Sequence, residues 1–150
     1  MKIYDLMIQH NLIEYDGVSH EETEEYQHKL YKAGMAVIPM AYTGFLGFTN
    51  GIQTDTLSLF GIGKPNSFVR DIFEINSVSG AINEDEIFLG DNSEEYLFYN
   101  WPMKSFVIVN KADKGKTKLF PFWDQALEYF LREYISETNA GTIEKLRKHI

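Results

Sequence analysis

The stretch Glu84–Lys111 reads EDEIFLGDNSEEYLFYNWPMKSFVIVNK and contains three runs that are rich in aromatic and β-branched residues. The runs are EIFLG, EYLFYNW and SFVIVNK, and the turns between them are DNSE and PM. Strands joined by such short turns pair antiparallel, because a parallel crossover needs about a dozen residues or more. The stretch therefore predicts sequential antiparallel strands, and KTKLFPFW at 116–123 can supply one more.

Helical patterns precede this sheet. Apolar residues at helical spacing predict a short helix over 2–11. Ser19 stands three residues before Glu22, which is the capping-box spacing, and it predicts a helix over 20–32. The apolar side of that second helix is expected to carry Tyr26, Leu30 and Tyr31.

The segment between these helices and the sheet shows further start and stop signals. A proline begins the predicted helix over 39–49, where its missing N–H costs nothing. Asn50–Gly51 ends that helix, since both residues tolerate a left-handed backbone. The alternation in 57–62 predicts a strand, and a short helix over 68–76 with Ser67 as its cap is expected to follow.

A last amphipathic helix is predicted over 122–135, in the run FWDQALEYFLREYI, and 142–150 resembles a final basic helical turn or two. Helices thus come first, sequential strands follow, and a helix closes the chain. This order predicts a single α+β domain with a central, mostly antiparallel sheet, N-terminal helices and a C-terminal helix packed against it. One face of the last helix is expected to carry Phe122, Ala126, Tyr129, Phe130 and Tyr134.

The composition of the chain excludes several classes of function. The 150 residues carry a net charge of -8, which opposes binding to nucleic acid, because phosphates demand a basic surface. There is no cysteine, which excludes a disulfide framework, a thiolate nucleophile and a cysteine zinc site. No targeting segment or apolar run of membrane-spanning length is visible in the sequence. We therefore expect a cytoplasmic protein without a membrane partner.

Motifs of catalysis and metal binding are weak. His20, Glu24 and His28 share one helix face, but they do not form the H-E-x-x-H zinc motif, so we expect a polar surface without a metal. The carboxylates within 84–95 could include an acid and a base of a hydrolase. Nothing in the sequence sets two of them at a defined separation, and residues that flank a turn are usually solvated. We therefore expect no catalytic residue and no cofactor.

Several stretches resemble the SUKH superfamily, and together they cover roughly residues 20–136. YTGFLGFTNGI (Tyr42–Ile52) with LSLFGI (57–62) is similar to that family's helix ending in Asn-Gly-Gly and followed by a strand. IFLGDNSEEYLFYNW (Ile87–Trp101) looks like its next signature, a strand ending in Leu-Gly, an acidic turn and an aromatic strand. Ile52 replaces the second glycine of the first motif, and DNSEE replaces a glycine-rich tract in the second.

The resemblance implies a non-enzymatic binding protein. Bacterial members of the superfamily are mostly cytoplasmic immunity proteins that bind and neutralise a specific toxin, often a nuclease. The acidic charge of the chain suits this role, because a nuclease toxin must be basic to hold its own substrate. We expect a cognate basic protein toxin as the partner and a monomer or weak homodimer. A small-ligand-binding or regulatory domain is the alternative, and a carboxylate-based hydrolase is a further one.

The candidate partner-binding residues lie in the acidic turn and the strand after it: Asp91, Glu94, Glu95, Tyr99 and Trp101. Strand alternation places alternate residues on opposite sides of the sheet, and one side must form the core. The other side, with the turn carboxylates, can face a partner through tyrosine and tryptophan anchors. A solvated turn between two core strands is the competing interpretation. The two sides carry Tyr96, Phe98 and Asn100, and Leu97, Tyr99 and Trp101.

Overall fold

A computed structural model describes residues 2–13, 15–64, 67–78, 84–115 and 117–132. Over these residues the chain forms five helices and one six-stranded antiparallel sheet, which confirms the predicted α+β class. The helices are α1 (Lys2–Gln9), α2 (His20–Lys32), α3 (Met40–Phe48), α4 (Ile72–Val78) and α5 (Trp123–Phe130). The strands are β1 (Ile52–Gln53), β2 (Leu57–Leu59), β3 (Glu86–Asn92), β4 (Glu95–Asn100), β5 (Ser105–Asn110) and β6 (Thr117–Phe120).

The sheet is a meander in which each strand pairs with the next one along the chain, in the order β1-β2-β3-β4-β5-β6. Phe98 in β4 lies opposite Phe88 in β3 and Val107 in β5. The register shifts between Phe88 and Gly90, where Leu89 is the extra residue of a β-bulge. The sequential antiparallel strands predicted between 86 and 120 are thus confirmed. The two-residue strand β1 was not predicted.

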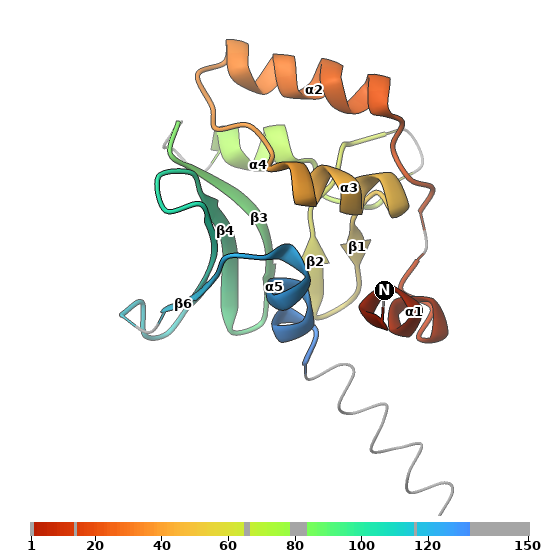
Figure 1. Ribbon diagram of the computed structural model, residues 1–150, viewed down its shortest axis with the longest axis vertical. Helices are drawn as coiled ribbons and strands as arrows, with labels where there is room; N and C mark the ends of the chain where they lie inside the picture. Colours follow the sequence, from red (N-terminus) through yellow and green to blue (C-terminus); the bar gives the residue numbers. More distant parts are fainter. Residues whose placement is uncertain (1, 14, 65–66, 79–83, 116, 133–150) are drawn as a thin grey trace, which may run out of the picture.

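The helices lie mainly on one side of the sheet. In Figure 1, α3 and α5 lie in front of the sheet, α2 runs across the top, and α1 lies beside the lower end of the sheet and packs against α5. The core fills the space between α3, α5 and the sheet. Its largest fully buried side chains include Tyr42, Phe45 and Phe106.

Local signals explain how α2 and α3 begin and end. The Ser19 hydroxyl accepts a hydrogen bond from the Glu22 amide at 3.2 Å, as the capping-box spacing predicts. After α3, Gly51 adopts φ +85°, a backbone conformation that favours glycine. The buried side chain of Asn50 pairs with the backbone of Ile62, donating to its carbonyl at 2.7 Å and accepting from its amide at 2.8 Å. The Asn-Gly pair therefore joins the end of α3 to the segment after β2.

Three local predictions were wrong. Tyr31 is 72% exposed and Phe122 is 66% exposed, so neither belongs to the core. Their helices turn other residues inward, since α5 buries Trp123 and Leu127 in place of the expected Phe122. Helix α4 begins at Ile72 rather than near 68, because Asp71, not Ser67, caps it by accepting a hydrogen bond from the Glu74 amide at 2.9 Å.

The end of the predicted last helix lies outside the described residues. The described part, α5, ends at Phe130, and the fold is described as far as residue 132. Tyr134 and the basic segment 142–150 belong to the part that the structure does not describe. Within the described part, Ala126 and Phe130 lie in the core as expected, and Tyr129 is partly buried against it.

Candidate partner-binding surfaces

The predicted binding stretch folds as β3, a tight turn and β4, and strand alternation separates its residues. Leu97 and Tyr99 point into the core, together with Glu95, whereas Tyr96 and Phe98 lie on the opposite face. The five candidate residues therefore do not form one exposed surface. Two of them are buried, two are partly buried, and only Glu94 is exposed.

Glu95 is a structural residue, which corrects its assignment to an exposed acidic turn. Its side chain is almost fully buried, and its Oε1 atom pairs with Nη1 of Arg132 at 3.0 Å. The Tyr129 hydroxyl donates to Oε2 at 3.2 Å, and Asn92 Nδ2 donates to Oε1 at 3.1 Å. A buried carboxylate is tolerated when it is paired and hydrogen-bonded in this way. Glu95 thus joins the β3–β4 hairpin to the end of α5.

Asp91 is partly buried and neutralised by two cations. Lys111 Nζ lies 3.2 Å from one carboxylate oxygen, and Arg70 Nη1 lies 3.7 Å from the other. The pairing of β4 with β5 brings Lys111 to the turn, where its amide donates to the Glu94 carbonyl at 2.7 Å. Lys111 lies 20 residues after Asp91 in the sequence, and strand pairing places it beside the acidic turn. The turn therefore has little net negative charge.

The two candidate aromatic anchors belong to the core and its margin. Tyr99 is buried in edge-to-face contact with Trp101 and Phe106, at ring-centre distances of 5.1 and 4.8 Å. Trp101 is partly buried, and its Nε1 donates to the Val37 carbonyl at 2.8 Å. Both rings stabilise the fold of the free chain, so they offer a partner less surface than the sequence suggested.

The opposite face of the sheet carries an aromatic row that the sequence analysis left undecided. The Phe88 and Phe98 rings stack at 5.0 Å, and Tyr96 meets Phe88 edge-on at 5.7 Å. All three rings are partly exposed. Lys111 Nζ lies 4.9 Å from the centre of the Tyr96 ring, in a cation–π contact. Lys111, one of the two cations that neutralise Asp91, therefore also flanks these partly exposed rings.

The first half of α2 holds four exposed carboxylates: Glu21, Glu22, Glu24 and Glu25. Glu22 pairs with Lys64 at 2.7 Å, and hydrogen bonds from Lys64 and Ser19 lower the pKa of its carboxyl group. Glu24 lies 3.0 Å from His20 Nε2. Over the described residues Glu21 and Glu25 form no ion pair. His20 and His28 are exposed, as predicted.

A hollow of about 760 Å³ beside α4 contains charged groups, but its central carboxylate serves the fold. Asp71 accepts hydrogen bonds from the Tyr26 hydroxyl at 2.6 Å and from the amides of Gly63 and Glu74 at 2.8 and 2.9 Å. Burial and the bond to Asp71 raise the pKa of the Tyr26 phenol, so it remains a neutral donor. This network joins α2 to α4, and it engages both oxygens of Asp71.

The part of the chain that the structure describes has neither a cluster of metal ligands nor a membrane-spanning helix. No group of three or more histidine or acidic side chains there could hold a metal ion. No described helix is long and apolar enough to cross a membrane. No protein-family model and no curated protein matches the sequence.

Proposed function

We propose that this chain is a non-enzymatic protein-binding domain, namely an immunity protein that binds a basic protein toxin and neutralises it in the cytoplasm. The toxin class that best fits the charge is a nuclease, because a nuclease needs a basic surface for its own substrate. The SUKH-like motifs in the sequence support this proposal, and so does the net charge of -8. The structural support is the distribution of that charge.

The observation that carries the proposal is the exposed acidic half of α2. Glu21, Glu24 and Glu25 lie in its first two turns, where no lysine or arginine is paired with them among the described residues. A single-sign patch of this kind raises the local concentration of oppositely charged partners and can accelerate association by about 10- to 1000-fold. The acidic surface expected near 91–95 is thus replaced by one on α2.

The contacts of three further carboxylates favour a structural role for them over hydrolysis. A carboxylate pair that works as acid and base must reach a substrate. Glu95 is buried against Arg132, Asp91 is held between two cations, and Asp71 accepts three hydrogen bonds. These three groups hold the fold together, and the exposed carboxylates of α2 face solvent on a convex helix.

The proposal is tested by co-expressing this chain with any basic protein that proves to be encoded beside it in its genome. Co-expression should relieve the toxicity of that protein, and the two chains should co-purify as a complex. Charge reversal of Glu21, Glu24 and Glu25 to lysine should slow association by about tenfold or more at low ionic strength and flatten its salt dependence. Stopped-flow measurements over a range of salt concentrations give both quantities.

A matched control is charge reversal of Glu84, Asp85 and Glu86, which are also exposed. Reversing these three carboxylates changes the net charge by the same amount. This control should slow association clearly less than the α2 variant does. If the two variants slow association equally, α2 is not the steering surface. If the neighbouring basic protein is neither bound nor neutralised, the immunity function itself is wrong.

A further inference from the structure

Helix α3 has a composition that is unusual for a surface helix. Its sequence, MAYTGFLGF, contains no charged residue, and a helix that is apolar all round is normally buried. Yet the side of α3 that faces away from the sheet is exposed. Met40 is 86% exposed at the start of this side, and Phe48 is 37% exposed at its end. The packing of the core does not account for these exposed apolar residues.

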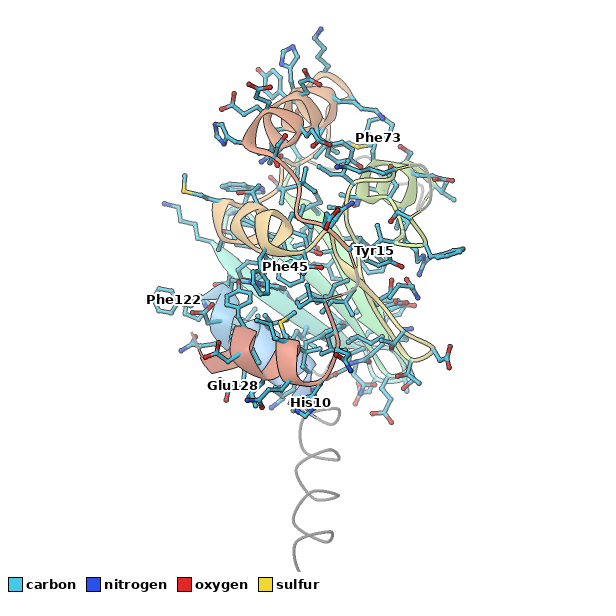
Figure 2. The ribbon with its side chains drawn as sticks, turned by 90° about the vertical axis from the view of Figure 1, so that its right-hand side faces the viewer. His10, Tyr15, Phe45, Phe73, Phe122 and Glu128 are labelled. Carbon is cyan, nitrogen blue, oxygen red and sulfur yellow. The ribbon has the colours of Figure 1, made fainter. Side chains whose placement is uncertain are left out.

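The exposed side of α3 forms one wall of a groove of about 670 Å³, here called the α1–α3–α5 groove. Ile8 of α1 and Phe122, just before α5, provide the other apolar walls and are 55% and 66% exposed. Figure 2 shows Phe122 projecting away from the body of the domain. Exposed apolar side chains that gather at one groove make this surface a candidate interaction site.

The floor of the groove is a glycine that the fold of this chain does not require. A Cβ atom built on Gly44 would meet nothing within 4 Å, and its backbone is not in the left-handed region. Glycine inside a helix costs stability relative to alanine. Its missing side chain leaves room for the backbone of another element to approach α3 closely, as small residues do where helices pack against each other.

The charges at the groove are all of one sign. Among the described residues, Asp5 and Asp124 line it, and no described lysine or arginine does. No described strand lines the groove, so an extended segment would find no backbone partner there. A helix satisfies its own backbone hydrogen bonds and needs no such partner. The groove therefore fits a helix with an apolar stripe flanked by basic residues.

We propose that the α1–α3–α5 groove is the docking site for a basic amphipathic helix of the partner protein. This inference rests on the proposed function, because it names the surface and the chemistry by which the toxin would be held. The acidic half of α2 then accelerates encounter, and the groove holds the partner once it has arrived. Charged surfaces act mainly on association, whereas buried apolar anchors act mainly on dissociation.

A synthetic peptide tests the groove without the toxin. The probe is a peptide of roughly 18 residues, long enough for five helical turns, with leucines at i, i+3, i+4 and i+7 and lysines elsewhere. Two-dimensional NMR of the full chain should show shift changes at Ile8, Gly44 and Phe122. Gly44→Leu, which fills the floor, should weaken binding by about tenfold or more. A peptide with glutamate in place of lysine should bind at least about tenfold more weakly.

Phe68→Ser is the matched control for Phe122→Ser. Phe68 is 83% exposed on the segment before α4, outside the groove, so both variants remove one exposed phenyl ring. Only Phe122→Ser should weaken binding of the peptide to the chain and accelerate dissociation of the toxin complex. Equal effects of the two variants, or shift changes confined to other surfaces, overturn the inference.

Two further results separate the inference from the proposed function. If the toxin is neutralised but Gly44→Leu leaves its dissociation rate unchanged, the immunity function stands and the groove is not its docking site. If sedimentation shows that the chain alone forms a dimer that Gly44→Leu dissociates, the occupant is a second copy, and the inference is wrong. If the peptide occupies the groove but no toxin is bound, the groove stands and the function fails.

Discussion

The two sides of α3 are both apolar, but they have different surroundings. On the side toward the sheet, Tyr42, Phe45 and Leu46 are fully buried. On the opposite side, Met40 and Phe48 reach solvent. The helix therefore resembles a core element of which only one side is covered by its own chain. The apolar composition of a helix thus indicates that its surface is suited to being covered. It does not indicate whether the same chain or another molecule covers it.

Packing on the covered side is dense and specific. The rings of Tyr42, Phe45 and Trp123 form a triangle with centre distances of 5.3, 5.0 and 5.2 Å. The Tyr42 hydroxyl also donates to the Phe60 carbonyl of the segment after β2. The exposed side has only one such aromatic contact, between Phe48 and Tyr4 at 4.9 Å, among the described residues. Substitutions on the two sides should therefore have very different effects on stability.

The largest effect is expected for Phe45→Ala. The Phe45 ring lies beneath α3 (Figure 2) and is fully buried, and it meets the rings of Tyr42 and Trp123. Removing it should lower the free energy of unfolding by about 3–5 kcal/mol, because the transfer free energy of the ring is lost and a large cavity is left behind. Urea unfolding measures the loss. A loss below about 1 kcal/mol would show that this side of α3 is not part of the core.

A smaller loss is expected for Tyr42→Phe, which keeps the ring and removes only the hydroxyl. That hydroxyl donates to the Phe60 carbonyl and, at 3.3 Å, to the Leu89 carbonyl. The Leu89 carbonyl still accepts from the Phe60 amide, but the Phe60 carbonyl loses its side-chain donor. The free energy of unfolding should fall by about 1–3 kcal/mol, which is the cost of an unsatisfied buried group. Unchanged urea unfolding would mean that water replaces the hydroxyl.

The sequence predicted the elements well where local signals determine them. The capping box at Ser19 fixed the start of α2, and alternation with short turns fixed β3, β4 and β5. The sequence could not decide which side of β4 is buried, because both sides carry aromatic rings and alternation is the same for either choice. That decision depends on which side α3 and α5 cover, and this is a long-range property.

The candidate site was harder to predict, for the same reason. The partners of Glu95 and Asp91 are Arg132 and Lys111, which are 37 and 20 residues away in the sequence. No local pattern shows that these carboxylates are neutralised. The groove, by contrast, has a visible signal in the sequence, namely the absence of any charged residue from 39–49.

A gain in stability is expected for Gly44→Ala on the exposed side. An added methyl group meets only open space there, so the alanine gains helix propensity without a clash, about 0.5–1 kcal/mol. The matched control is Gly17→Ala, where the new Cβ would overlap the carbonyl oxygen of Gly47 and should destabilise the fold. Thermal and urea unfolding compare the two variants. A loss in Gly44→Ala would show that this side of α3 is covered after all.

The smallest effect on stability is expected for Met40→Gln. Glutamine and methionine have nearly equal helix propensities, and at 86% exposure the methionine gives up almost no buried area. The free energy of unfolding should therefore change by less than about 0.5 kcal/mol, as is usual for surface positions.

Met35→Gln is the matched control for this substitution, because Met35 is only 6% exposed and belongs to the core. Met35→Gln should lower the free energy of unfolding by well over about 1 kcal/mol, since it buries an amide group without hydrogen-bond partners. Urea unfolding of both variants gives the difference between a methionine that the chain has covered and one that it has not. If Met40→Gln destabilises the fold as much as Met35→Gln does, the exposed side of α3 is already part of the core. The difference between the two sides of the helix, on which the groove depends, would then not exist.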